Sequence, residues 1–102
     1  MERSWRLMHG DTLVGELRLD GVDQPWFLCH FTAGPGWEEV RALFEGWDSL
    51  SGPDPDGQRN SAYIKPLMAL GMTLVDEIDG RTLPLFHQCI VRIGGQRARV
   101  RC

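Results

Sequence analysis

The chain has 102 residues, of which 42% are hydrophobic and 25% are charged, and these are ordinary values for one globular domain. The composition argues against intrinsic disorder, and no stretch approaches the roughly 20 apolar residues that a membrane-spanning helix needs. The formal net charge of −3 disfavours contact with nucleic acid or anionic membranes unless positive charge is clustered on the surface. We therefore expect a single domain over residues 1–102.

The first third of the chain alternates between apolar and polar residues, as half-buried β-strands do. Trp5 and Leu7 fall on one face of residues 4–10, and the same alternation continues through residues 12–21. His9-Gly10-Asp11 and Asp20-Gly21 predict two tight turns. The aromatic stretch QPWFLCHFTAG follows the second turn. Residues 4–34 thus predict a three-strand antiparallel meander.

The hydrophobic period changes after Gly34-Pro35-Gly36. Apolar residues then recur at helical spacing and predict a helix over residues 37–47. The segment DSLSGPDPDGQRN predicts an exposed loop. A second helix is expected to start with Asn60 or Ser61 as its cap and to end at Gly71. Pro66 predicts that this helix is short or bent, or that it begins only near the proline.

Strand patterns return in the last third of the chain. MTLVDEI and LPLFHQCIVRI predict strands separated by a turn at Asp79-Gly80-Arg81, and QRARVRC predicts a last strand after Gly94-Gly95. Runs of strands and helices that are segregated indicate an α+β fold. We expect a largely antiparallel sheet, built from the N-terminal meander and two or three C-terminal strands, with two helices packed on one face.

The C-terminal arginines allow two interpretations. Arg97, Arg99 and Arg101 share one face of QRARVRC, while an alanine, a valine and a cysteine share the other. Residues 92–102 hold four arginines and no acid, whereas the rest of the chain carries seven basic and fourteen acidic side chains. A nucleic-acid arm would need more cations and nearby aromatic residues for stacking. The alternation favours a strand with its arginines in water.

Two cysteine–histidine pairs are the only pairings in the sequence that resemble metal or nucleophile chemistry. Cys29-His30 and His87-x-Cys89 lack the C-x2-4-C spacing of a structural zinc site, so we expect no metal and no cofactor. Cys29 and Cys89 fit buried, inert cysteines, while Cys102 is expected to be exposed. An odd number of cysteines argues against a secreted disulfide framework and predicts a cytoplasmic protein.

The acidic clusters predict turns and solvated surface. Asp76, Glu77 and Asp79 lack the ligand spacing of a calcium loop, and the adjacent Glu38 and Glu39 do not face one another on a helix. We therefore name no catalytic residue.

Two predicted strands are apolar on both faces. In QPWFLCHF, one face carries Trp26, Leu28 and His30, and LPLFHQCIVRI is similar. Such strands are either covered on both faces or carry an interface, and exposed apolar patches mark partner binding more often than catalysis. The candidate binding residues are Trp26, Leu28, His30, Phe86, His87, Arg97, Arg99 and Arg101.

The stretches HGDTLVGELRLDG and LGMTLVDEIDG resemble segments of short proteins of no established function from actinobacteria such as streptomycetes. The chain has one lysine and ten arginines, and this bias is typical of proteins from GC-rich bacterial genomes, as the resemblance also suggests. The resemblance implies no activity and no site residues.

Three functional hypotheses follow from the residues. The leading one is a non-enzymatic protein-binding or regulatory interaction module, with a protein partner or a second copy of the chain as its ligand. The alternative is a small-molecule binder or enzyme with a pocket between the sheet and the 48–60 loop, where His30, His87 or Cys89 would supply the polar groups. The third is weak nucleic-acid binding through the C-terminal arginine strand. No membrane partner is expected.

Overall fold

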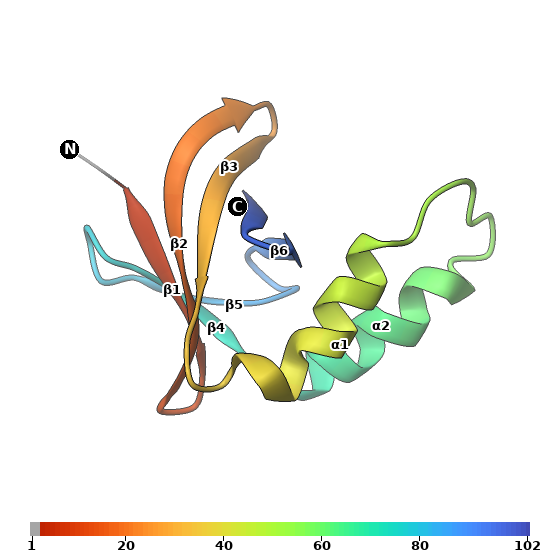
Figure 1. Cartoon of the computed structure of the whole chain (residues 1–102), viewed down its shortest axis with the longest axis horizontal. Coiled ribbons are helices and arrows are strands. Elements are labelled where there is room, and N and C mark those ends of the chain that lie inside the picture. The colour runs from red at the N-terminus through yellow and green to blue at the C-terminus, as the bar shows by residue number, and fades with distance from the viewer. Residues whose placement is uncertain (1–2) are drawn as a thin grey trace.

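The computed structural model describes residues 3–102. Its strands form a seven-stranded antiparallel sheet in the order β5-β4-β1-β2-β3-β7-β6, and this sheet curls around its inner face (Figure 1). The α+β class and the N-terminal meander are therefore confirmed. The elements are β1 (Ser4–His9), β2 (Thr12–Asp23), β3 (Trp26–Ala33), α1 (Trp37–Asp48), α2 (Gln58–Ala69), β4 (Thr73–Asp76), β5 (Thr82–Pro84), β6 (Ile90–Gly94) and β7 (Arg97–Arg101).

The C-terminal strands extend the meander on both sides. β4 pairs with β1 and carries β5 at its far side, while β7 pairs with β3 and carries β6. Residues of the last third of the chain therefore lie beside β1 and also beside β3. This arrangement makes β5 and β6 the edge strands and leaves the meander in the centre of the sheet.

The core lies between the inner face of the sheet and the first helix. The ring of Phe31 on β3 lies 4.7 Å from that of Trp37 on α1, and the Trp37 ring lies 5.7 Å from that of Phe44, about two helical turns later. α2 packs beside α1 on the same side of the sheet (Figure 1). Both helices are thus on one face, as predicted. Neither one is long and apolar enough to cross a membrane.

The predicted turn at Asp20-Gly21 is wrong. β2 continues to Asp23, and its hairpin with β3 turns instead at Gln24-Pro25. Leu19 pairs with Cys29 and Gly21 pairs with Leu28, so Asp20 is an extra residue in a β-bulge. The Asp-Gly pair thus interrupts the ladder without ending it.

The second helix begins earlier than predicted. α2 starts at Gln58 after its N-cap Gly57, whose φ is 70°. The Asp54 carboxylate accepts hydrogen bonds from the amides of Asn60 at 3.0 Å and Arg59 at 3.3 Å. Pro66 lies within the helix rather than at its start. Proline has no backbone N–H, so one helical hydrogen bond is lost. The burial of the neighbouring Leu67 side chain, which is complete, offsets the free energy of that loss.

The stretch predicted as one strand, LPLFHQCIVRI, is two strands joined by a tight turn. β5 ends at Pro84, and β6 starts at Ile90. Phe86 has a φ of 68°, and its amide donates a hydrogen bond of 2.7 Å to the carbonyl of Cys89. The reversal brings the Phe86 ring to 5.9 Å from the ring of Trp47. The contact between Phe86 and α1 therefore coincides with the break between β5 and β6. Four strands, β4 to β7, follow the helices.

Candidate interaction surface

The C-terminal arginines belong to a strand in the sheet. In β7, Ala98 and Val100 are buried while Arg97, Arg99 and Arg101 are exposed. This pattern is the one that alternation predicts, because successive side chains of a strand point to opposite faces. The arginine row therefore lies on the outer face of the sheet.

Pairing between strands gathers further basic residues around this row. His30 pairs with both Arg18 and Arg97, Leu28 pairs with Arg99, and Arg99 pairs with Arg92. Residues paired directly across a ladder point to the same face. We call the resulting surface the basic sheet face, and its members are Arg18, Leu28, His30, Arg92, Arg97 and Arg99.

The charges of the basic sheet face are only partly neutralised. Arg97 forms an exposed ion pair of 3.2 Å with Asp20, the residue that the bulge in β2 leaves unpaired in the ladder. Arg92 donates to the carbonyl of Trp47 at 3.2 Å and lies 4.9 Å from that ring's centroid. Within residues 3–102, no carboxylate lies within 4.0 Å of Arg99. Directly opposed like charges destabilise a sheet, so the Arg92–Arg99 pair favours an anion from outside.

A hollow of about 240 Å³ opens at this surface. It is lined by three arginines and one carboxylate, namely Arg92, Arg97, Arg99 and Asp48, together with Gly94 and Ala98. A Cβ at Gly94 would overlap the Asp48 carboxylate, so the glycine is what admits this acid from the end of α1. The hollow keeps an excess of positive charge.

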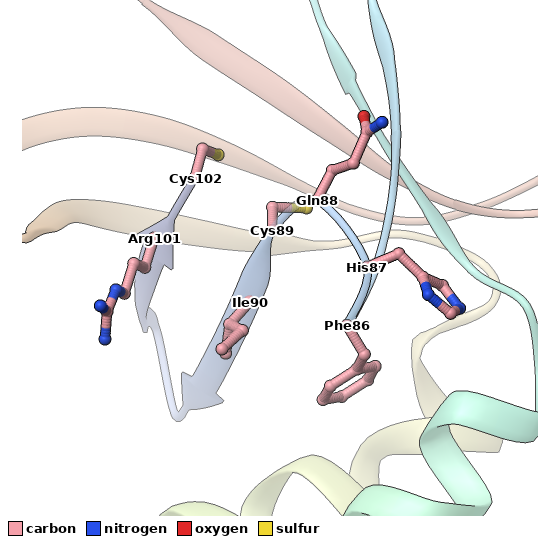
Figure 2. A pocket seen from close by; sticks show the side chains of 7 residues that line it. All are labelled: Phe86, His87, Gln88, Cys89, Ile90, Arg101 and Cys102. Atoms are coloured by element: carbon pink, nitrogen blue, oxygen red, sulfur yellow. The ribbon is translucent and has the colours of Figure 1, made fainter.

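The remaining predicted binding residues do not all join this surface. Trp26 shares the outer side of β3, and Arg101 pairs with Ile90 at the far end of the hairpin. Phe86 and His87 lie in the turn before β6, where they line a separate hollow of about 370 Å³ with Cys89 and Arg101 (Figure 2).

The polar groups predicted for a pocket between the sheet and the 48–60 loop lie in two different hollows, and no residue of 48–60 lines either of them. His30 lies at a third hollow, beside Trp37, while His87 and Cys89 share the hollow of Figure 2. The three polar groups named for a small-ligand site therefore do not converge. In the part of the chain that the structure describes, no cluster of three or more His, Cys, Asp or Glu residues could hold a metal ion.

The internal cysteines are poor nucleophiles. Cys29 and Cys89 are both buried, and burial raises the pKa of each thiol to about 12. Only the thiolate attacks, so these buried groups are almost entirely unreactive toward reagents from solution at neutral pH. The prediction of buried cysteines at these positions is confirmed.

Sequence reasoning missed a buried carboxylate at one end of the inner face, which pairs with a partly exposed arginine. Asp76 was predicted to be a solvated turn residue, yet it is 5% exposed and lies opposite Trp5. Its carboxylate lies 3.1 Å from the guanidinium of Arg3, which is itself 4.8 Å from the ring centroid of Trp5. The same carboxylate accepts the Ile78 amide at 2.9 Å, so the turn-forming part of the prediction is confirmed. No motif marked Asp76, because its burial depends on β4 pairing with β1.

This carboxylate makes stability depend on pH. Burial alone would raise the pKa of Asp76, but the hydrogen bonds from Ile78 and Arg3 and the charge of Arg3 together hold it below its usual value. A lowered pKa in the folded state gives stability that is complete above the unfolded value of about 3.9 and is lost as the pH falls through the folded value.

Asp76→Asn is therefore expected to lower the free energy of unfolding at pH 7 by about 1–2 kcal/mol, because it removes the ion pair with the partly exposed Arg3. The difference from the unchanged protein should shrink as the pH is lowered below 4. Urea unfolding at pH 7 and at pH 3 measures it, with Asp79→Asn as the exposed control. An equal loss of unfolding free energy at pH 7 and at pH 3 would contradict the conclusion that the ionised Asp76 carboxylate stabilises the fold.

No family model matches the chain, and no curated protein or solved structure is significantly similar to it.

Proposed function

We propose that this chain is a non-enzymatic interaction module of the bacterial cytoplasm that binds an acidic protein segment across its basic sheet face. The observation that carries the proposal is the opposed pair Arg92 and Arg99, since a partner's carboxylate would relieve their repulsion. Bidentate pairing with a carboxylate suits the guanidinium fork. The apolar side chain of Leu28 beside them adds a contact that a purely electrostatic site would lack.

An acidic protein fits this surface better than nucleic acid does. The whole chain carries a net charge of −3, and acidic side chains lie within the basic area itself. Asp20 pairs with Arg97, and Asp48 lines the hollow beside Arg92. These carboxylates would repel a continuous phosphate backbone, whereas a folded or extended protein segment can place its charges between them.

The test uses a fluorescent peptide rich in Asp, Glu and Leu, and a second peptide in which amides replace the acids. The chain is expected to bind the acidic peptide only. Arg97→Ala/Arg99→Ala should weaken that binding by about tenfold or more, with an affinity that falls as salt rises. Fluorescence anisotropy measures both.

A matched control removes the same charge elsewhere. Arg41→Ala/Arg59→Ala takes two exposed arginines from α1 and α2 and should leave binding unchanged. Equal losses in both double variants would show that only net charge matters and would overturn the proposal. Tighter binding of a single-stranded oligonucleotide than of the acidic peptide would favour nucleic acid instead. Light scattering of both double variants tests whether a second copy of the chain is the partner.

A further inference from the structure

Two cysteines face each other at the open end of the β6–β7 hairpin. Val91 pairs with Val100, and Ile90 pairs with Arg101. The next position of the same ladder sets Cys89 against Cys102. Figure 2 shows both side chains at this end of the hairpin, and both line the same hollow. A side-chain hydrogen bond between the two thiols is among the causes that shift the pKa of each, and Cys29 has no such bond to Cys102.

The turn at the other end of the hairpin determines whether Cys89 and Cys102 form a hydrogen-bonded or a non-hydrogen-bonded pair. Gly94 and Arg97 close a two-residue turn in which Gly95 has a φ of 60°, and such a closing pair is hydrogen-bonded. Hydrogen-bonded and non-hydrogen-bonded pairs alternate along an antiparallel ladder, so the pair at 89 and 102 is non-hydrogen-bonded. The direction of the Cys89 carbonyl is consistent with this, because it accepts a hydrogen bond from the Phe86 amide and so points away from β7.

This geometry suits a disulfide. Non-hydrogen-bonded pairs have Cα atoms about 4.5 Å apart, which lies within the range of about 4.4–6.8 Å that disulfides span. The side chains of such a pair lie on the same face of the sheet, so no strand needs to rotate for the bond to form. The third cysteine does not compete, because Cys29 lies across from Ala98 on β7.

We propose that Cys89 and Cys102 form a reversible disulfide across the β6–β7 hairpin, made by exchange with a small disulfide such as oxidised glutathione. Cys102 is exposed and reacts first, while Cys89 is buried. The Cys102 thiolate attacks one sulfur of the small disulfide and releases one thiol. Cys89, on losing its proton, then attacks the Cys102 sulfur and displaces the second thiol. The protein loses two electrons and two protons, and the small disulfide gains them as two thiols.

The bond would staple the edge strand that carries Arg92 to the strand that carries Arg99. The proposal does not depend on the basic sheet face binding a partner, since it concerns the opposite, inner side of the same two strands. Oxidation would hold the hairpin closed at the end that lacks a turn.

The full chain, reduced and freed of reductant, is incubated with oxidised glutathione and then examined by intact mass spectrometry without reduction. A monomer that has lost the hydrogens of two thiols is expected, and peptide mapping should link Cys89 to Cys102. The melting temperature should rise by about 10–15 °C, because the bond closes a short loop in the unfolded chain, and a dithiol reductant should reverse the rise. A lasting glutathione adduct, a Cys102-linked dimer, or three thiols that remain free would each overturn the proposal.

Three single-cysteine variants identify which two cysteines form the disulfide. Cys102→Ser changes an exposed side chain, so it should fold normally, and oxidised glutathione should then leave its melting temperature unchanged. Cys89→Ala should stop at the mixed disulfide on Cys102. Cys29→Ala is the matched control and should still form the internal disulfide. Loss of the bond in this control, in a protein that remains folded, would assign the chemistry to Cys29 and contradict the proposal.

Discussion

Phe44→Ala is expected to lower the free energy of unfolding by about 3–5 kcal/mol, the usual cost of removing a buried aromatic ring. Phe44 is completely buried in α1, and its ring lies 5.7 Å from that of Trp37. α1 lies between the inner face of the sheet and α2, so neighbours on both sides hold the cavity open. The loss is a large share of the roughly 5–15 kcal/mol that a domain has in total.

Urea unfolding followed by tryptophan fluorescence measures this loss, because Trp37 and Trp47 lie on the same buried helical stripe. Phe86→Ala serves as the control, since Phe86 packs against Trp47 but is only half-buried, and its removal should cost less. A cost for Phe44→Ala below that of Phe86→Ala would show that the first helix does not anchor the core as described.

Gly15→Ala is expected to destabilise the protein by about 1–3 kcal/mol, although alanine is ordinarily the better residue within a strand. Gly15 is buried in β2, and a Cβ there would overlap the ring of Phe31 and lie 2.9 Å from the backbone oxygen of Thr32. The ring can shift only into the core, and the backbone oxygen is held by the sheet. Gly15 therefore leaves the space that Phe31 occupies.

Gly21→Ala is the matched control in the same strand. A Cβ at Gly21 would meet only Leu28, at an ordinary 3.7 Å. Its replacement should therefore be neutral or slightly stabilising. Thermal unfolding of both variants provides the comparison. Similar effects at the two glycines would mean that backbone propensity, rather than the Phe31 ring, decides the cost.

The β6–β7 hairpin links the two proposals made for this protein. Its outer side carries Arg92, Arg97 and Arg99, while its inner side carries buried valine and isoleucine residues and ends at the cysteine pair. Alternation along the strands separates the two sets, so each can be changed without touching the other. The acidic-peptide assay and the disulfide assay therefore test the proposals separately.

Sequence patterns predicted the elements whose signals are local. The alternation of Trp5 with Leu7, the helical spacing from Trp37 to Trp47 and the alternation in QRARVRC all survive in the structure. The predictions failed where a distant contact opposed the local signal. Asp20-Gly21 forms a bulge because β3 pairs on past it, and Phe86 reverses the chain where its ring meets Trp47.

Only part of the basic sheet face could be predicted from the sequence. The arginines at 97, 99 and 101 could be placed on one strand face, because a period of two is a property of the backbone. Arg92 joined them only through the register of β6 against β7, and Asp76 was buried only when β4 paired with β1. Strand order and register depend on core packing across the whole fold, and no local pattern encodes them. The fold class and the faces of the strands thus follow from the chain itself, while the opposed arginines, the buried carboxylate and the facing cysteines exist only once the strands have paired.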